Sequence, residues 1–264
     1  MSRLAAWVLP PLAAVALLLL VWELVLRLGH PGALVLPTPG AVLRALHADD
    51  GVLARAAAVT AEEALAGFAV GTACGLALAI ATGESAIVRR GLYPLLVTTQ
   101  AIPPIALATP LAIWLGYGLW PKVIVAALLV FFPVFVNAHA GLTRLEPGLE
   151  RLLRSFGASR LQVLRVARLP SALPLVLAAL RLGATYAVIG AVFGEWVGAD
   201  DGLGIYLLQA NGRLQTDHVF AAVLVLAALG LLAFGLVALA EHVLTPWLRR
   251  STRPRWRLAG GLRR

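Results

Sequence analysis

The stretch PGLERLLRSFGASRLQVLRVARLP, from Pro147 to Pro170, is the longest part of the middle of this chain that could not lie in a lipid bilayer. Hydrophobic segments flank it on both sides. Its charged side chains, which are costly in hydrocarbon, are mostly arginines: Arg151, Arg154, Arg160, Arg165 and Arg168. The stretch is therefore predicted to be a loop outside the membrane that connects two membrane spans.

Two short helices are predicted within this loop. Pro147 suits the first turn of a helix, and Gly157 can end that helix as a C-cap. The apolar residues between them follow the 3–4 spacing of an amphipathic helix. They are Leu149, Leu152, Leu153 and Phe156. Ser159 and Gln162 have the spacing of a capping box, so a second helix is predicted to begin there. Leu169-Pro170 is then expected to redirect the chain into the next span.

The residues alone leave two interpretations of this helix pair open. A compact helix–glycine–helix turn can dock in a groove of a partner protein and transmit force to the membrane spans. The same pair can instead lie on anionic lipid headgroups, which the spacing of its arginines also suits.

Composition places the whole chain among polytopic membrane proteins. Of its 264 residues, 60% are hydrophobic and 13% are charged, and the mean hydropathy is +0.87. A soluble domain has about a quarter of its residues charged. The single cysteine, Cys74, lies in an apolar run and excludes an internal disulfide or a Cys/His metal cluster. The single lysine, Lys122, is not part of a GxxxxGK[ST] phosphate-binding loop. We therefore expect no metal, no cofactor and no catalytic residue in this chain.

Six apolar segments are long enough to cross a bilayer, which takes about 20 helical residues. They are residues 5–28, 56–82, 91–115, 122–142, 171–197 and 218–243. The first is expected to be an uncleaved span, because its apolar run is too long for a signal peptide. The prediction is an all-α membrane protein with six transmembrane helices in one domain, residues 1–264. The loop of residues 144–170 lies between the fourth and fifth spans.

Local patterns add detail to these spans. Glycines recur every four residues in the second span, so one face of that helix admits a neighbouring backbone closely. They are Gly67, Gly71 and Gly75. In the third span, Pro103-Pro104 removes two backbone donors and is predicted to break or kink the helix. Before the second span, Thr38 can cap a short surface helix that starts at Pro39. A plain loop is the alternative there.

The Lys and Arg side chains indicate which side of the membrane is cytoplasmic. The side of the termini carries the larger set: Arg3, Arg89, Arg90, the arginines from Arg144 to Arg168, Arg181 and those of the tail from Trp247 to Arg264. The other side carries Arg27, Arg44, Arg55, Lys122 and Arg213. Because cytoplasmic loops hold the Lys/Arg excess, both termini and the loop of residues 144–170 are expected in the cytoplasm. The polar loop of residues 199–217 then faces outward. The net charge of +9 needs no nucleic acid to explain it.

Four polar residues within the predicted spans are candidates for a translocation path. They are Gln100, Asn137, Tyr186 and Glu195. Polar groups in spans usually face the interior of a helix bundle, although a hydrogen bond between neighbouring helices explains each of them equally well. Glu62 and Glu63, near the outer end of the second span, are interpreted as hydrated residues of the membrane interface.

The loop resembles the cytoplasmic signature of binding-protein-dependent ABC importer permeases, Glu-Ala-Ala–x3–Gly–x9–Ile–x–Leu-Pro. Gly157 and Leu169-Pro170 match it in identity and spacing. Arg151 stands at the glutamate position, and Glu150 is one residue out of register. The two alanines and the isoleucine are replaced by Leu152, Leu153 and Ala167.

Other stretches extend this resemblance over most of the chain. They are Val35-Leu36-Pro37-Thr38-Pro39, Gln100-Ala101-Ile102-Pro103-Pro104, and Gly194-Glu195-Trp196-Val197-Gly198-Ala199 followed by Gly202-Leu203-Gly204. Together they are similar to the nitrate, sulfonate and taurine branch, which includes permeases for thiamine-precursor pyrimidines and for riboflavin. The runs Gln209-Ala210-Asn211 and Gln215-Thr216-Asp217 look most like the pyrimidine and riboflavin members.

The resemblance implies a homodimer of six-helix subunits in the cytoplasmic (inner) membrane that works by alternating access. Two separate ATPase subunits would bind ATP and Mg, and a solute-binding protein would sit outside. The residues implied to dock on the ATPase are Arg151, Leu152, Leu153, Phe156, Gly157, Ala158, Ser159, Leu169 and Pro170. The rival functions are a secondary transporter or channel and, much less favoured, a membrane-embedded enzyme, for which no HExxH or paired membrane aspartates are present.

Overall fold

The computed structural model describes residues 3–29, 32 and 34–245, and all regular secondary structure in them is helical. This confirms the predicted all-α fold, while the basic tail from Trp247 lies outside the described residues. The elements are α1 (Arg3–Gly29), α2 (Pro39–Ala48), α3 (Asp50–Glu84), α4 (Ala86–Thr98), the 3-10 turn η1 (Thr99–Ala101), α5 (Pro104–Leu115), α6 (Leu119–Thr143), α7 (Pro147–Ser155), α8 (Arg160–Val163), the π-helical segment η2 (Leu164–Arg168), α9 (Leu169–Glu195), α10 (Leu203–Gly212) and α11 (Thr216–Leu244).

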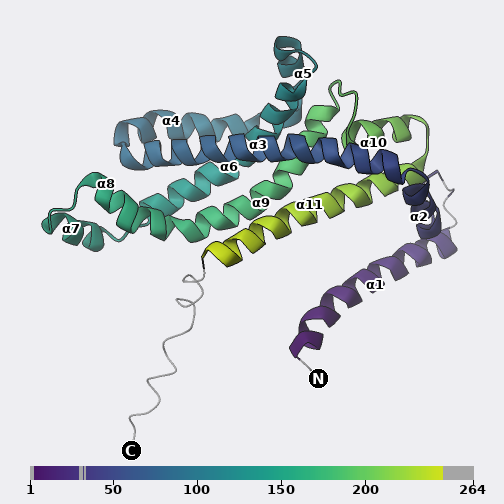
Figure 1. Cartoon of the computed structure of the whole chain (residues 1–264), viewed down its shortest axis with the longest axis horizontal. Coiled ribbons are helices and arrows are strands. Elements are labelled where there is room, and N and C mark those ends of the chain that lie inside the picture. Colours follow the sequence, from purple (N-terminus) through teal and green to yellow (C-terminus); the bar gives the residue numbers. More distant parts are fainter. Residues whose placement is uncertain (1–2, 30–31, 33, 246–264) are drawn as a thin grey trace, which may run out of the picture.

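The centre of the fold is α6, which packs between α3 and α9 (Figure 1). Glycines let both neighbours approach it at backbone distance. A Cβ atom added at Gly71 of α3 would lie 2.5 Å from the carbonyl oxygen of Ala127 on α6. One added at Gly194 of α9 would lie 2.6 Å from Cα of Lys122 on α6. The glycine face predicted for the second span therefore forms a helix–helix contact, and α9 uses glycine in the same way.

Five helices of the described chain are long and apolar enough to cross a membrane. Three of them are α1, α3 and α6, and the other two are Arg160–Glu195 and the helix α11. The pair Ala86–Ala101 and Pro104–Leu115 makes a sixth span if it is counted as one, although it is bent by 98°. Ile102, which precedes the two prolines, has an extended backbone with φ −90° and ψ 116°, as residues before proline prefer. The prediction that the prolines break the third span is confirmed.

The predicted turn at Leu169-Pro170 is wrong. Residues Arg160–Glu195 form one continuous helical run, so the loop leads into the span without a break in the helix. The π-helical segment η2 explains how proline is tolerated, because the N–H of Leu169 bonds to the carbonyl of Leu164, five residues back. Pro170 has no N–H to donate, and the wider π turn fits the proline where a regular α turn would clash.

Two other segments differ from expectation. The predicted polar loop of residues 199–217 contains the helix α10, whose first turn is held by residues from distant helices described below. By contrast, α2 forms as predicted, because the N–H of Ala41 donates to Oγ1 of its N-cap Thr38 at 3.2 Å. The helix α1 diverges from the bundle (Figure 1) and is joined to it by Trp22, whose Nε1 donates to the carbonyl of Pro37 at 3.1 Å.

Candidate functional site

The predicted helix pair forms a hairpin at one end of the long helices (Figure 1). The helix α7 ends at Ser155 and its C-cap is Phe156; Gly157 follows with φ +84°, a value that favours glycine. The N–H of Ala158 returns to the carbonyl of Leu153 at 3.1 Å. The capping box is complete: the N–H of Ser159 donates to Oε1 of Gln162 at 2.7 Å, and the N–H of Gln162 donates to Oγ of Ser159 at 3.3 Å. The shape of the hairpin is thus fixed by its own backbone and caps.

Apolar side chains at the hairpin tip face outward. Phe156 is 82% exposed and Leu152 is 52% exposed. Phe156 also borders a cavity of about 290 Å³ with Leu153, Gly157 and Ala158. Arg151 is exposed on the same helix α7. An exposed apolar tip rimmed by arginine is a surface of the kind that binds a partner protein.

An ionic cluster joins this hairpin to the membrane helices. Nη2 of Arg168 lies 2.9 Å from Oε2 of Glu150 on α7, and Nη1 lies 2.7 Å from Oε1 of Glu84 at the end of α3. Arg154 lies one helical turn from Glu150 and also bonds to it, at 2.9 Å. Hydrogen bonds from Arg168 and Arg154 hold the pKa of the Glu150 carboxyl below its usual range. The glutamate that is out of register with the family signature therefore binds within its own chain.

Three of the four predicted path residues come together. Gln100 in η1, Asn137 on α6 and Tyr186 on α9 line one cavity of about 670 Å³. Nδ2 of Asn137 donates to the carbonyl of Pro133 in the same helix at 2.8 Å. The rest of the lining is mostly apolar: Leu96, Thr99, Ile102, Pro104, Leu107, Leu128, Leu129, Phe131, Phe132, Pro133 and Val136. The broken third span thus forms one wall of a cavity that has several neutral polar groups and no charged side chain.

Glu195 lies away from that cavity, although the sequence grouped it with the other three. Its side chain is fully buried, with 0% exposed. Oγ1 of Thr60 on α3 donates to Oε1 of Glu195 at 2.6 Å, and the N–H of Gly204 donates to Oε2. The same Thr60 oxygen accepts the N–H of Leu203 at 2.9 Å. Glu195 and Thr60 therefore cap the first turn of α10, which satisfies donors that a helix start leaves open.

Sequence reasoning missed a second buried pair at this end of the bundle. Nζ of Lys122 on α6 lies 2.7 Å from Oε1 of Glu63 on α3, and Glu63 is only 2% exposed. The interpretation of Glu63 as a hydrated interface residue is therefore wrong. Burial of a lone carboxylate is costly, and the ammonium group of the lysine compensates it. The sequence held a partial signal for this pair, because both residues were placed at the outer ends of predicted spans. Only the packing of α3 against α6 brings them together.

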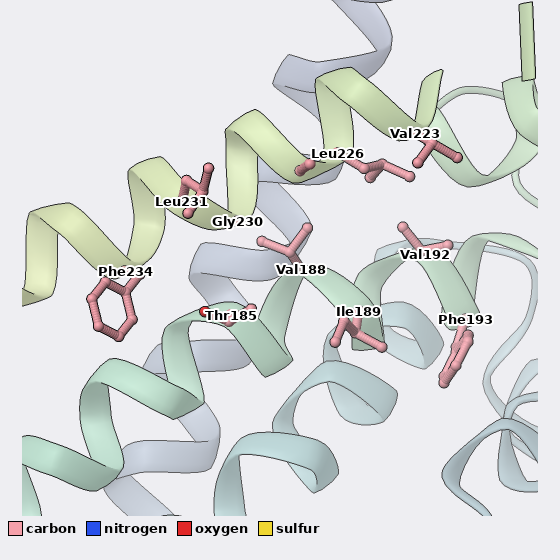
Figure 2. Close-up of a pocket in the computed structure, with 11 residues that line it drawn as sticks. Thr185, Val188, Ile189, Val192, Phe193, Val223, Leu226, Gly230, Leu231 and Phe234 are labelled. Atoms are coloured by element: carbon pink, nitrogen blue, oxygen red, sulfur yellow. The ribbon is translucent and has the colours of Figure 1, made fainter. Parts of the chain in front are cut away.

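A second large crevice lies between α9 and α11 (Figure 2) and has a volume of about 540 Å³. Side chains such as Val188, Leu226 and Phe234 line it, and its polar side chain is Thr185. Such a surface suits lipid tails or a neighbouring apolar helix better than a polar solute. Among the described residues, no group of three or more His, Cys, Asp or Glu side chains is arranged to hold a metal ion.

Comparison with known proteins assigns the class. Residues 71–245 match the family model of the binding-protein-dependent transport system inner membrane component, and the chain belongs to this family. It is therefore the permease of an ABC importer, a multi-pass protein of the inner membrane. The resemblance seen in the loop and in the other stretches is confirmed.

Two relatives and one solved structure illustrate the match. A probable ABC transporter permease of Haemophilus influenzae is 38% identical over 223 residues, which cover 84% of this chain and 91% of that protein. The formylaminopyrimidine transport permease ThiX of Halalkalibacterium halodurans is 35% identical over 245 residues, 92% of this chain and 97% of that one. An inward-facing structure of the MetNI methionine ABC transporter aligns with a TM-score of 0.60 at 20% identity, covering 72% of this chain and 96% of that one. The last match shows a shared fold.

Proposed function

We propose that two copies of this chain form the membrane path of the importer, and that α7 and the turn after it dock on a separate ATPase subunit. The observation that carries this proposal is the exposed apolar tip of the hairpin. Phe156 and Leu152 are the contacts we assign to the ATPase groove, with Arg151 beside them and Gly157, Ala158 and Ser159 forming the turn.

The remaining residues that we assign to coupling lie further along the helix. Leu153 lines the cavity that Phe156 also borders. Leu169 and Pro170 lie where the hairpin continues into the membrane span, so they carry the connection rather than the contact. In this scheme ATP and Mg bind to the two ATPase subunits. Their closure moves both hairpins, the halves of the dimer rock, and no covalent bond is made or broken by the permease.

The path that we assign to the solute passes the cavity of Gln100, Asn137 and Tyr186. Its broken-helix wall supports this assignment, because irregular backbone at membrane depth is tolerated where it lines a cavity. Glu195 would contribute indirectly, by holding α10 in place. A solute-binding protein would deliver its cargo at the end of the bundle opposite the hairpin, where α10 lies (Figure 1).

The cavity lining favours an uncharged polar solute. Amide and hydroxyl groups from Gln100, Asn137 and Tyr186 can hydrogen-bond such a molecule, and aromatic rings such as Phe132 can stack on it. A nitrate or alkylsulfonate anion, or the sulfonate group of taurine, would call for a cationic group, and the described lining contains none. We therefore propose a pyrimidine-like or flavin-like cargo, which agrees with the transport named for ThiX.

The orientation that we propose places both termini and the hairpin in the cytoplasm. The distribution of Lys and Arg along the sequence supports it. The basic hairpin, with Arg151, Arg154 and Arg160, lies at one end of the long helices. The buried Glu63–Lys122 pair and α10 lie at the other end. Accessibility of single cysteines placed at Arg160 and Arg213 to a membrane-impermeant reagent in intact cells tests this orientation.

Co-purification and uptake together test the proposed function. The tagged permease should retain its ATPase and take up cargo from its binding protein when ATP is supplied. Deletion of the tip, residues 152–159, should abolish both ATPase retention and uptake. Deletion of the same number of residues from the N-terminus of α1 is the control. Uptake that persists in vesicles without the ATPase would contradict the proposal and favour a secondary transporter or channel.

A further inference from the structure

Arg168 connects three segments that are far apart in the sequence. Its guanidinium lies 2.7 Å from Glu84, at the end of α3, and 2.9 Å from Glu150, on α7. It also approaches the carbonyl of Gly83 at 3.4 Å. The Arg168 side chain is only 17% exposed. A planar guanidinium can hold two carboxylates at once, which a lysine ammonium on a flexible stem does less well.

The backbone beneath Arg168 belongs to the membrane body. Arg168 is the last residue of η2, and Val163 and Ala167 of the same run are 1% and 8% exposed. Immediately beyond, a Cβ atom added at Gly141 of α6 would lie 2.7 Å from Cα of Ala172 on α9. Close packing of this kind transmits displacement rather than absorbing it. A displacement of η2 should therefore displace α9 and α6 with it.

The hairpin does not need Arg168 to keep its shape. Gly157, the Ser159–Gln162 capping box and the return bond from Ala158 already define the turn. The bond from Arg168 to Glu150 instead sets where α7 lies relative to the membrane helices. Arg154 and Arg168 both donate hydrogen bonds to the carboxylate of Glu150, so this carboxylate is already paired within the chain before any partner protein binds.

We propose that Arg168 is the positioning residue that passes a displacement of α7 to α3 and α9. This inference rests on the proposed function, in which an ATPase subunit moves α7. Arg168 then acts as a joint: Glu150 moves with the hairpin, Glu84 moves with α3, and the guanidinium keeps both at a fixed distance from α9. Without the joint, the hairpin would still move with the ATPase, but the membrane helices would not move with the hairpin.

A distance measurement that needs no cargo tests this joint. In a Cys74→Ser background, a spin label at Arg213→Cys reports the separation of the two α10 helices in the permease dimer with its ATPase. Pulsed electron paramagnetic resonance compares the nucleotide-free complex with the complex in ATP and vanadate, and ATP hydrolysis is measured on the same sample. The variants are Arg168→Met, Arg168→Lys and the milder Glu150→Gln. Arg165→Met, an exposed arginine of the same segment η2, is the matched control.

The wild type and Arg165→Met should show the full nucleotide-dependent change in label distance. Arg168→Met and Glu150→Gln should lose most of that change while they still retain the ATPase and hydrolyse ATP at the rate of Arg165→Met. Arg168→Lys, which keeps a cation but not the fork, should give an intermediate change.

Two results overturn the inference. A full distance change in Arg168→Met would show that the joint transmits nothing. A parallel loss of ATPase retention and distance change in both Arg168→Met and Glu150→Gln would show that the cluster serves folding or docking. Failure of the proposed function gives a different result, because the unsubstituted permease itself then retains no ATPase. That result also overturns the proposed role of Arg168.

Discussion

Thr60 on α3 donates a hydrogen bond to Glu195 on α9 at 2.6 Å, across 135 residues of sequence. Both side chains are fully buried. Together they accept the N–H groups of Leu203 and Gly204, so two membrane helices cap the first turn of a third helix, α10. An acidic group at a helix N-terminus is favourable. The contact explains why a glutamate is stable in the interior of this fold.

Replacement of Glu195 tests this cap. Glu195→Ala leaves the N–H of Gly204 without its acceptor, whereas the Thr60 hydroxyl keeps a second acceptor, the carbonyl of Ala56 at 3.1 Å. We expect a loss of about 2 kcal/mol in stability. Glu195→Gln keeps an acceptor of the same size and should lose only about 1 kcal/mol. Thermal unfolding in detergent measures both, with the exposed neighbour Glu62→Ala as control. Because Glu195 lies outside the cavity, uptake by each variant should decrease only in proportion to the amount of folded permease that is lost. Equal melting of Glu195→Ala and Glu62→Ala would refute the cap.

The glycine contact between α3 and α6 gives a second stability test. A Cβ atom at Gly71 would lie 2.5 Å from the Ala127 carbonyl oxygen, so Gly71→Ala must separate the helices. We expect a cost of about 2 kcal/mol. Gly51, at the start of the same helix, has nothing within 4 Å of such an atom, and Gly51→Ala should stabilise by up to about 1 kcal/mol. Melting curves of the two variants should therefore shift in opposite directions. A shift in the same direction would contradict the packing.

Two adjacent residues of α9 line different cavities. Tyr186 lines the cavity with Gln100 and Asn137, and Thr185 lines the apolar crevice of Figure 2. Tyr186→Phe removes one hydroxyl from the cavity that we assign to the solute. The loss of one hydrogen bond, about 0.5–1.5 kcal/mol, predicts uptake about twofold to tenfold slower at unchanged expression. Thr185→Val, which removes a hydroxyl from the other crevice, is the matched control and should transport normally. The reverse result would move the path to the crevice between α9 and α11.

Local signals in the sequence predicted the parts of this structure that depend on near neighbours. Gly157 and the Ser159–Gln162 pair shape only the backbone within a few residues of their own positions, and the hairpin forms as they indicate. The run through Pro170 was mispredicted, because tolerance of a proline depended on a π turn that local rules do not forecast.

Contacts between distant residues account for what the sequence left open. The pattern indicated that Glu195 would face inward, as polar groups in spans do. It could not distinguish a cavity from a helix N-terminus, because α10 comes to Glu195 only after α3 and α9 have packed. The same holds for Glu63 and Lys122, which are 59 residues apart and meet only across the α3–α6 contact.

The hairpin tip offers a test of docking that does not involve charge. Phe156 is 82% exposed, so Phe156→Ala removes little from the fold of the permease itself. If its ring fills a pocket on the ATPase, truncation should cost at least about 2 kcal/mol of binding, or roughly thirtyfold in affinity. Ile87→Ala, an equally exposed residue at the start of α4 with 86% exposed, is the control. Retention of the ATPase by immobilised permease is the measurement. Equal retention by the two variants would exclude Phe156 as an anchor.

Arg151 stands where the family signature has a glutamate, so the groove that receives it should differ in charge. The glutamate of this chain, Glu150, is held by Arg168 and Arg154 and cannot take the family role without leaving them. We therefore expect an acidic residue on the ATPase opposite Arg151. Arg151→Glu should weaken ATPase retention, and the defect should be largest at low salt, where charge repulsion is least screened. Phe156→Ala should weaken retention by a similar factor at all salt concentrations. Tighter binding by Arg151→Glu would instead show that the groove has kept a basic partner for the family glutamate, and that Arg151 loosens the contact.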